Sequence, residues 1–280
     1  MRLARVGPPG AERPVVVEAD GRLLDLTSRT ADIDGDFLSR KLPDLDPSEL
    51  PELADPGRRG PPVARPGKVV GIGLNYTSYA AALGVDPPTE PVVFLKASTS
   101  ICGPTDTVHG LPGSLTTDHE VELGVVIGQR LSGVVDAARA RSAVAGYLLA
   151  NDVTDRALVG VGGPWAKGKC ADTFCPIGPW LVTPDELTDP GDLELCLSVN
   201  HTVRQRARTS EMVFDVPTLV TYLCSLMTLE PGDLIITGTP AGVAVARPEP
   251  KPYLRDGDVM ELTATGLGEQ RTPFAAHAAP

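Results

Sequence analysis

The chain has 280 residues, of which 42% are hydrophobic and 22% charged, and its net charge is −11. This length and composition allow a buried core in one large domain, or in a small domain joined to a larger one. The acidic balance argues against a nucleic-acid partner, because binding to phosphates needs a basic surface. An anionic small-molecule substrate would need local positive charge, supplied by a metal ion or by well-placed lysines and arginines.

The cysteines and the apolar segments indicate where the protein acts. Five cysteines at scattered positions form neither a disulfide framework nor a zinc-ligand pattern, so reduced thiols are expected. The N-terminus lacks the apolar core of a signal peptide, and no segment reaches membrane-spanning length. These features favour a cytoplasmic protein with no membrane partner.

The start of the chain has the pattern of a β-hairpin. Two apolar segments, 14–19 and 22–26, flank the dipeptide Asp20-Gly21. This dipeptide suits a two-residue turn that needs positive φ angles. We therefore expect two antiparallel strands near the N-terminus, joined by a tight turn.

A linker pattern follows the predicted hairpin. Polar and acidic sequence with weak helical character extends to about residue 54. The next segment, 55–62, contains three prolines, two glycines and two arginines, a composition typical of a connection between domains. We predict a small β-containing domain at residues 1–60 and a larger domain at 61–280.

The larger domain combines many short apolar segments with a few amphipathic ones. The 28 prolines and 29 glycines of the chain indicate many turns, and therefore a strand-rich fold. Apolar residues at helical spacing predict a helix at 216–227, and weaker patterns predict helices at 75–84 and 136–143. The expected strands are 69–73, 91–96, 120–127, 146–150, 234–236 and 259–262. This mixture predicts a β-rich α+β fold.

Carboxylates gather on one of these predicted strands. Residues two apart on a strand project from the same side, so Glu120 and Glu122 converge. Asp152 follows a separate strand, whose end can present a side chain to a cleft. Three carboxylates form a hard-oxygen site suited to Mg²⁺, Mn²⁺ or Ca²⁺. The alternative is an amphipathic strand with one hydrated face, which produces the same spacing without a metal.

An ordered series of motifs extends from residue 68 to about residue 270. The motifs include Gly73-Leu74-Asn75-Tyr76, Pro91-Val92-Val93-Phe94-Leu95-Lys96, Asp118-His119-Glu120-Val121-Glu122-Leu123, Asn151-Asp152-Val153-Thr154-Asp155-Arg156, Gly168-Lys169-Cys170 and Thr237-Gly238-Thr239-Pro240. In this order they resemble the catalytic domain of the fumarylacetoacetate hydrolase family. The resemblance implies a mixed β-roll catalytic domain of that type, a small non-catalytic N-terminal domain and a homodimer.

The resemblance also implies a metal site and its chemistry. Glu120, Glu122 and Asp152 match the family's metal ligands, and Mg²⁺ is the expected ion. A 2-oxo acid or a 1,3-dicarbonyl substrate has neighbouring oxygens that can chelate such an ion. The metal would then stabilise the enolate that forms when a bond to the adjacent carbon breaks.

Two cationic residues match catalytic positions of the family. Lys169 matches the active-site lysine, which can neutralise carboxylate or enolate charge. Arg156 matches an arginine beside the metal-binding aspartate. Each has a simpler alternative: Lys169 can be an ordinary surface lysine, and Arg156 can pair with its neighbour Asp155.

Four further residues match substrate-binding positions by the same resemblance. Gly238 and Thr239 belong to a loop that contacts the substrate in the family. Tyr76 and Gln205 are weaker matches. The alternative for the loop is a tight turn that needs its glycine for backbone reasons.

One departure from the family pattern bears on the reaction. Family hydrolases usually carry a histidine and a glutamate, three residues apart, after the Asn-Tyr pair, and this dyad activates water. Here these positions hold Tyr79 and Ala82. A phenol with a pKa of about 10 is a poor base at neutral pH, although it can donate a proton or a hydrogen bond. None of the four histidines replaces the missing one by a simple register shift; His119 is expected to point to the apolar side of its strand.

The metal ligands and the lysine without the dyad favour reactions that need only enolate stabilisation. These are tautomerisation or isomerisation, decarboxylation and dehydration of a small 2-oxo acid or 1,3-dicarbonyl compound. Hydrolysis of an acylpyruvate-type C–C bond is the alternative, and needs another base such as Glu122 or a metal-activated water. A catalytically inactive binding protein on the same fold is the second alternative.

Overall fold

The computed structural model describes residues 1–159 and 164–277. Residues 160–163 and 278–280, which belong to the predicted larger domain, lie outside the described part. The α-helices are α1 (Thr77–Leu83), α2 (Ala137–Ser142), α3 (Ala166–Lys169) and α4 (Val216–Leu226). The strands are β1 (Arg2–Val6), β2 (Arg13–Val17), β3 (Leu23–Asp25), β4 (Glu52–Leu53), β5 (Val69–Gly73), β6 (Val92–Lys96), β7 (Ile101–Cys102), β8 (Val108–His109), β9 (Thr117–Asp118), β10 (Val121–Ile127), β11 (Val144–Asn151), β12 (Thr154–Asp155), β13 (Cys175–Pro176), β14 (Leu181–Val182), β15 (Glu194–Val199), β16 (Thr202–Arg208), β17 (Leu234–Ile236), β18 (Val259–Ala264) and β19 (Gly268–Ala275).

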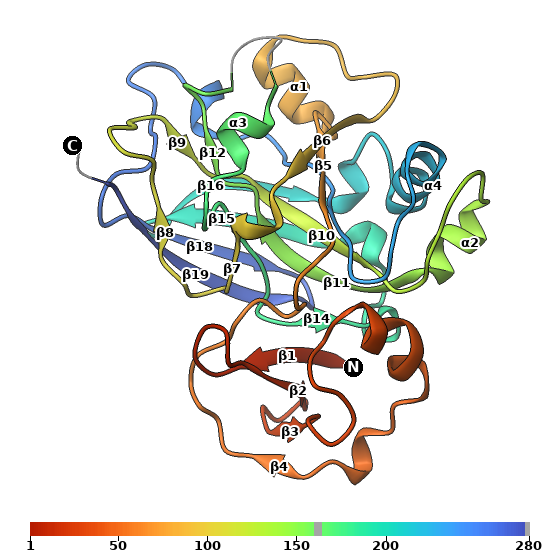
Figure 1. Cartoon of the computed structure of the whole chain (residues 1–280). Coiled ribbons are helices and arrows are strands. Elements are labelled where there is room, and N and C mark those ends of the chain that lie inside the picture. Colours follow the sequence, from red (N-terminus) through yellow and green to blue (C-terminus); the bar gives the residue numbers. More distant parts are fainter. Residues whose placement is uncertain (160–163, 278–280) are drawn as a thin grey trace.

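Most of the strands belong to two sheets. The larger sheet has ten strands in the order β4-β3-β2-β1-β14-β11-β10-β17-β5-β6, and the smaller has five in the order β16-β15-β18-β19-β8. β9 pairs with β12 and β7 with β13 outside both sheets. Figure 1 shows β1 to β4 in the lower part of the molecule, and the smaller sheet beside β10 and β11 in the upper part. The predicted β-rich mixture of strands and helices is confirmed.

The N-terminal hairpin is also confirmed. β2 and β3 pair in antiparallel fashion, with Val15 opposite Asp25 and Val17 opposite Leu23. Gly21 in the connecting turn has a φ of +90°, a region that favours glycine. β1 pairs with β2 and with β14, so these strands extend the sheet that contains β10 and β11. The division of the chain near residue 60 stays a prediction.

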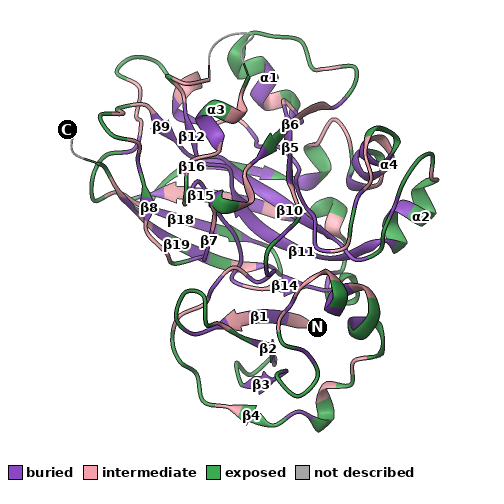
Figure 2. Ribbon diagram, in the orientation of Figure 1, coloured by how far each residue is buried: buried purple, intermediate pink, exposed green. Residues whose placement is uncertain are grey.

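β10 lies between two hydrophobic clusters. Val121 and Leu123 pack on one side in the larger cluster, which includes residues of α4 and of the smaller sheet. Val126 joins Leu148 of β11 in a second cluster, which includes Phe37 from the N-terminal region. All of β10 is buried, as Figure 2 shows for the centre of the molecule. Because β10 is covered on both faces, side chains at its start are shielded from bulk water.

The three predicted helices are confirmed, with slightly shorter bounds, as α1, α2 and α4. α2 begins after Asp136, whose side chain accepts a hydrogen bond from the Arg139 amide over 2.7 Å, and Asp215 caps α4 in the same way. α1 ends at Leu83 and is capped by Gly84, which has a φ of +71°. The sequence pattern did not predict α3, which carries Lys169. Within the described residues, no helix is both long and apolar enough to cross a membrane.

Candidate active site

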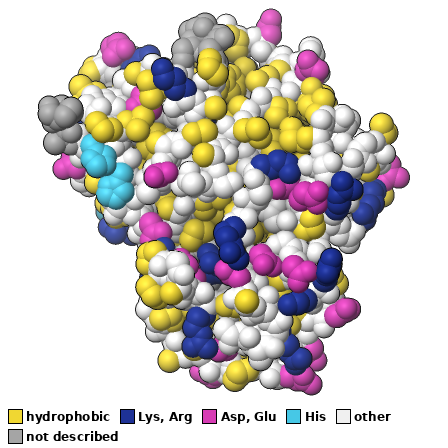
Figure 3. All heavy atoms as spheres, in the orientation of Figure 1, with side chains coloured by type: hydrophobic (Ala, Val, Ile, Leu, Met, Phe, Trp, Pro, Cys, Tyr) yellow, Lys and Arg dark blue, Asp and Glu magenta, His cyan; other side chains and the backbone are white. Residues whose placement is uncertain are grey.

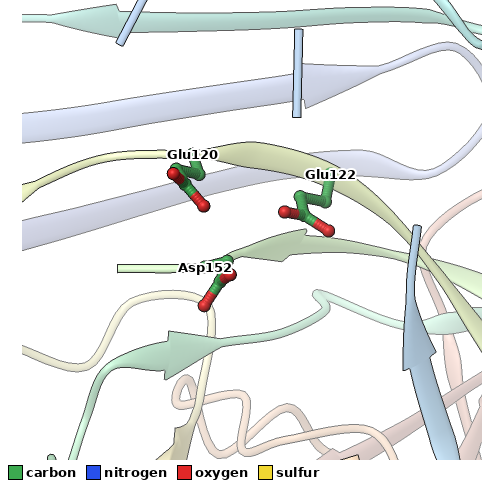
Figure 4. A group of neighbouring side chains, drawn as sticks. All are labelled: Glu120, Glu122 and Asp152. Carbon is green, nitrogen blue, oxygen red and sulfur yellow. The ribbon is translucent and has the colours of Figure 1, made fainter. Parts of the chain in front are cut away.

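The three predicted metal ligands meet where β10 begins and β11 ends. These strands are antiparallel, with Val121 opposite Asn151, so Glu120 and Asp152 flank the same end of the pair. The Asp152 amide donates to the Glu120 carbonyl oxygen over 2.9 Å. The carboxylates of Glu120 and Glu122 are directed toward Asp152 (Figure 4). One oxygen from each carboxylate lies within 4.8 Å of the others.

This donor set fits a hard divalent cation. All three side chains are buried, and carboxylate oxygens are the ligands that Mg²⁺, Mn²⁺ and Ca²⁺ prefer. Glu122 accepts a hydrogen bond from the Gly238 amide over 2.7 Å, and the described chain gives it no ion pair. Burial, together with the negative charges of Asp152 and Glu120, raises the pKa of Glu122 well above its usual value. A divalent cation among the three carboxylates would supply the positive charge that Glu122 lacks.

Lys169, at the end of α3, is buried among the same carboxylates. Its Nζ donates to Glu120 Oε2 and to Thr154 Oγ1, each over 2.8 Å, and also to Asp152. Burial opposes its positive charge, but Asp152 and Glu120 outweigh burial and raise the pKa of Lys169. The alternative of an ordinary surface lysine is wrong, because the side chain is only 4% exposed.

A second buried lysine, Lys96, has no role in the sequence-based prediction. It ends β6, and its Nζ donates to Asp152 Oδ1 and, over 3.4 Å, to the Val153 carbonyl oxygen. Its side chain is fully buried, whereas the preceding Leu95 is 48% exposed. Asp152 therefore receives a different lysine on each of its two oxygens. A lysine at the end of an apolar strand is the signal that could have identified this residue.

Arg156 connects two acidic residues of the site. Its Nε donates to Asp118 Oδ2 over 2.9 Å, and its Nη2 to Glu120 Oε1 over 2.5 Å. Asp118 also accepts a hydrogen bond from the Val245 amide over 3.0 Å, which ties the segment after β17 to this cluster. The alternative pairing of Arg156 with Asp155 is wrong, because Asp155 accepts from a threonine hydroxyl instead.

The charged side chains lie against a cavity of about 540 Å³. Its volume falls within the range of small-molecule sites, roughly 300–1,000 Å³. The polar side chains on its wall are Tyr79, Glu120, Glu122, Arg156, Lys169 and Thr239. Its larger apolar side chains are Ile72, Leu74, Leu83, Val85, Phe94, Val159, Trp165 and Val245.

Tyr79 of α1 lines this cavity at the position where family hydrolases carry a histidine by the resemblance described above. The pKa of its hydroxyl is raised to about 12, mainly by burial; Arg156 lowers this pKa and Glu120 raises it. The hydroxyl is therefore protonated at neutral pH. It can donate a hydrogen bond into the cavity, but it is a poor base there.

The segment after β17 brings two predicted substrate-binding residues to the site. Thr239 lines the cavity, and its hydroxyl donates to the Val121 carbonyl oxygen over 2.9 Å. Gly238 donates its amide to Glu122 and so positions a predicted metal ligand. Gly238 has a φ of +99°, and a Cβ there would lie 2.7 Å from the Asn75 Cβ. A side chain at this position would therefore strain the backbone and clash.

Gln205 and Tyr76 lie behind the described cavity wall rather than on it. Gln205 accepts from the Val121 amide over 3.0 Å and donates to Thr239 Oγ1 over 2.8 Å. Its Oε1 also lies 3.2 Å from Nδ1 of His119. Tyr76 is fully buried, and its hydroxyl has no hydrogen-bond partner among the described residues. Both residues support the wall, and a direct substrate contact by either stays a prediction.

The cavity wall, as far as it is described, contains none of the four histidines. His119 is buried, and burial lowers its pKa, so the ring is neutral. His201 lies 3.0 Å from the Glu261 carboxylate, and the rings of His109 and His277 are 5.8 Å apart. Within the described residues, no histidine therefore takes the place of the missing base.

Comparison with known proteins assigns this architecture. Residues 68–275 match the model of the C-terminal domain of fumarylacetoacetate hydrolase. The chain belongs to the fumarylacetoacetate hydrolase family. The matched segment contains every residue of the cavity and all three clustered carboxylates. The resemblance and the fold type expected from the ordered motifs are thereby confirmed.

Relatives of this family member include proteins named as hydrolases and as isomerases. A protein of Burkholderia multivorans, provisionally named a hydrolase, is 50% identical over 275 residues, which cover 96% of this chain and 97% of its own. Fumarylacetoacetate hydrolase from Exiguobacterium antarcticum is 35% identical, with a TM-score of 0.87 and coverage of 99% of this chain and 100% of its own. The 2-hydroxyhepta-2,4-diene-1,7-dioate isomerase from Mycobacterium marinum is 34% identical, with a TM-score of 0.76 and coverage of 99% and 98%.

One similar structure contains a metal ion. Maleylpyruvate hydrolase from Sphingobium sp. SYK-6, in complex with manganese(II) and pyruvate, is 29% identical to this chain. Its TM-score is 0.75, and the match covers 99% of this chain and 100% of that one. Both isomerases and hydrolases thus occur among proteins of this architecture.

Proposed function

We propose that this protein is a divalent-metal-dependent enzyme that stabilises the enolate of a small 2-oxo acid or 1,3-dicarbonyl compound. The reaction is an isomerisation, a decarboxylation or a dehydration. The observation that carries this proposal is the buried oxygen-donor set of Glu120, Glu122 and Asp152, beside a cavity where Tyr79 replaces a base. Mg²⁺ is the expected ion, with Mn²⁺ or Ca²⁺ as alternatives.

The side chains of the cavity have separate tasks in this proposal. A bound divalent cation supplies electrostatic stabilisation of the charge that develops on the enolate oxygen. Lys169 stays charged and attracts the substrate carboxylate. Arg156 holds Glu120 in place through its 2.5 Å hydrogen bond. Tyr79, protonated at neutral pH, donates a hydrogen bond to a substrate oxygen.

Hydrolysis of a C–C bond in an acylpyruvate-type substrate is the second candidate, because hydrolases occur among the relatives. This reaction consumes one water molecule and needs a group that removes a proton from it. Two carboxylates line the described cavity wall, Glu120 and Glu122. Glu120 is paired with Lys169 and Arg156, so Glu122 is the candidate base.

Turnover of a substrate panel in D₂O separates these candidates. The panel contains oxaloacetate, acylpyruvates and sugar acids, each tested with Mg²⁺ or Mn²⁺ and with chelator. We expect metal-dependent deuterium exchange, loss of CO₂ or loss of water, without C–C hydrolysis. Hydrolysis into two acids at about 1 s⁻¹ or faster would favour the second candidate. No turnover together with no metal binding would favour an inactive binding protein.

We also propose that the protein is a homodimer whose only other partner is the anionic substrate. β6 forms an edge of the ten-stranded sheet, and its Leu95 is 48% exposed. Edge strands present unpaired backbone groups that readily pair with another chain. Light scattering is expected to give twice the mass of one chain, and Leu95→Lys is expected to shift the mass toward that of the monomer.

A further inference from the structure

The cavity has two chemically different parts. Its charged part comprises Glu120, Glu122, Arg156 and Lys169, which is sufficient to hold the oxo-acid portion of a substrate. A three-carbon oxo acid fills only a fraction of about 540 Å³. The remaining volume lies against apolar side chains from α1, β6 and the segments around residues 165 and 245. The chemistry of the substrate group that fills the remaining volume therefore defines the substrate class.

The apolar part contains an aromatic pair for which β5 leaves room. The rings of Phe94 and Trp165 are 5.6 Å apart at an interplanar angle of 62°, an edge-to-face contact. A Cβ on Gly71 would lie 2.1 Å from the Phe94 ring, and a Cβ on Gly73 would lie 2.1 Å from the Trp165 ring. Gly71 and Gly73 are two residues apart on β5, so they lie on the same face of the strand. Because neither has a side chain, this face leaves room for both rings.

The aromatic pair adjoins the charged part directly. The Lys169 ammonium lies 4.9 Å from the centroid of the Phe94 ring, within cation–π range. At the outer end, Leu83 and Val85 line the cavity and are 39% and 47% exposed. Figure 3 shows hydrophobic side chains gathered at the top of the molecule, over α1 and β6. An apolar group bound here would cover surface that is otherwise in contact with water.

The described wall offers no cation for a second carboxylate of the substrate. Arg156 and Lys169 are its only cationic residues. Lys169 is assigned to the carboxylate of the oxo-acid portion, and Arg156 is ion-paired with both Asp118 and Glu120. A distal carboxylate against this wall would lose water without gaining a partner, which is unfavourable.

We infer that the substrate is a monocarboxylate whose distal group is uncharged and apolar, either aromatic or branched aliphatic. This inference rests on the proposed function, because it assigns the carboxylate and the enolisable part to the charged side of the cavity. It separates this chain from the isomerase relative, whose name specifies a dioate, a compound with two carboxylates.

Two matched ligands test the inference without requiring turnover. N-Phenyloxamate and N-(4-carboxyphenyl)oxamate both present the neighbouring oxygens of a 2-oxo acid, and neither has an enolisable carbon. Calorimetric titration of Mn²⁺-loaded protein is expected to give a Kd at least about tenfold lower for the phenyl ligand, a ratio typical of a group that suits an apolar pocket. Equal affinities, or tighter binding of the carboxyphenyl ligand, would overturn the inference.

A charge added to the wall provides the second arm of the test. Leu83→Lys and Val85→Lys each place a cation at an exposed position, and Leu83→Gln and Val85→Gln are the uncharged controls. In at least one lysine variant, the ratio between the Kd values of the two oxamate ligands is expected to be about threefold smaller than in its glutamine control. Ratios that are unchanged in both lysine variants would overturn the inference, because the distal group would then lie elsewhere.

The outcomes distinguish the inference from the proposed function. A phenyl preference in a protein that shows no metal-dependent turnover of any 2-oxo acid would overturn only the proposed function. Metal-dependent turnover combined with a preference for the carboxyphenyl ligand would overturn only the inference. Failure of both oxamates to bind the metal-loaded protein would overturn both.

Discussion

The charged and apolar parts of the cavity are built in opposite ways. Glu120, Asp152 and Lys169 are buried and held by several hydrogen bonds each. Leu83 and Val85, on the apolar side, are partly exposed. Buried ion pairs are costly to break, whereas partly exposed apolar side chains are easily exchanged. The charged part therefore fixes the chemistry, and the apolar part is where specificity can change at little cost in stability.

The largest expected effect is the loss of Asp152. Asp152→Ala leaves Lys96 and Lys169 buried without a shared partner, and we expect a loss of about 3–5 kcal/mol of unfolding free energy. Metal binding should be lost as well. Urea unfolding measures the stability, and Leu83→Ala, in the apolar part, is the control with an expected loss below about 1 kcal/mol. Equal losses of unfolding free energy in the two variants would contradict the proposed difference between the charged and apolar parts of the cavity.

A double substitution in α1 is expected to change the reaction. Tyr79→His with Ala82→Glu puts a base and its orienting carboxylate three residues apart, on one face of the helix. We expect C–C hydrolysis of an acylpyruvate to rise about 100-fold, the lower range of general-base catalysis. The rate of release of two acids measures this, with each single variant as a control. No gain would mean that the missing dyad does not limit hydrolysis.

Substitution of Glu122 is expected to weaken metal binding without lowering the folding stability. Glu122→Gln removes a carboxylate without an ion pair, so stability without metal should stay the same or rise, since burial and like charges disfavour its ionised form. The Kd for Mn²⁺ should rise about tenfold or more. Titration with Mn²⁺ measures the affinity, and Glu90→Gln at an exposed position makes the same change in net charge. A large loss of stability without metal would show that Glu122 is structurally required.

A smaller effect is expected in the aromatic pair. Trp165→Leu should raise KM for an apolar acylpyruvate several-fold and leave kcat within about twofold, because the ring binds the ground state and the transition state equally. Steady-state kinetics measures both constants, and Trp180→Leu, which is not on the described wall, is the control. A fall in kcat alone would place Trp165 in the chemical step.

The smallest expected effect is that of pH on Tyr79. Its folded pKa of about 12 lies above the ordinary value of 10.0, so any stabilisation linked to its proton is complete below pH 10 and is lost only toward pH 12. Between pH 6 and 10, the parent and Tyr79→Phe should show the same tyrosinate absorbance at 295 nm. Extra absorbance in the parent below pH 10 would show that Tyr79 ionises and can act as a base.

Local patterns predicted much of the fold. The Asp20-Gly21 turn, the capped helix α4 and the strand β10 appear where short-range spacing places them. The site was predicted less completely. The sequence pointed to Glu120 and Glu122 through strand alternation, but not to Lys96, whose inward direction depends on how β6 pairs with β5. The apolar part of the cavity was not predicted, because in the sequence Phe94 and Trp165 cannot be told apart from ordinary hydrophobic core residues.

By itself, the sequence determined the features that depend on the geometry of a few consecutive residues. The side shared by Glu120 and Glu122 is such a feature, because strand side chains alternate with a period of two. Only the tertiary structure decided which distant residues meet: Arg156 pairs with Asp118 rather than with its neighbour, and β1 joins the central sheet through β14. Such contacts follow from which strands pair across the sheet, and local periodicity contains no information about that choice.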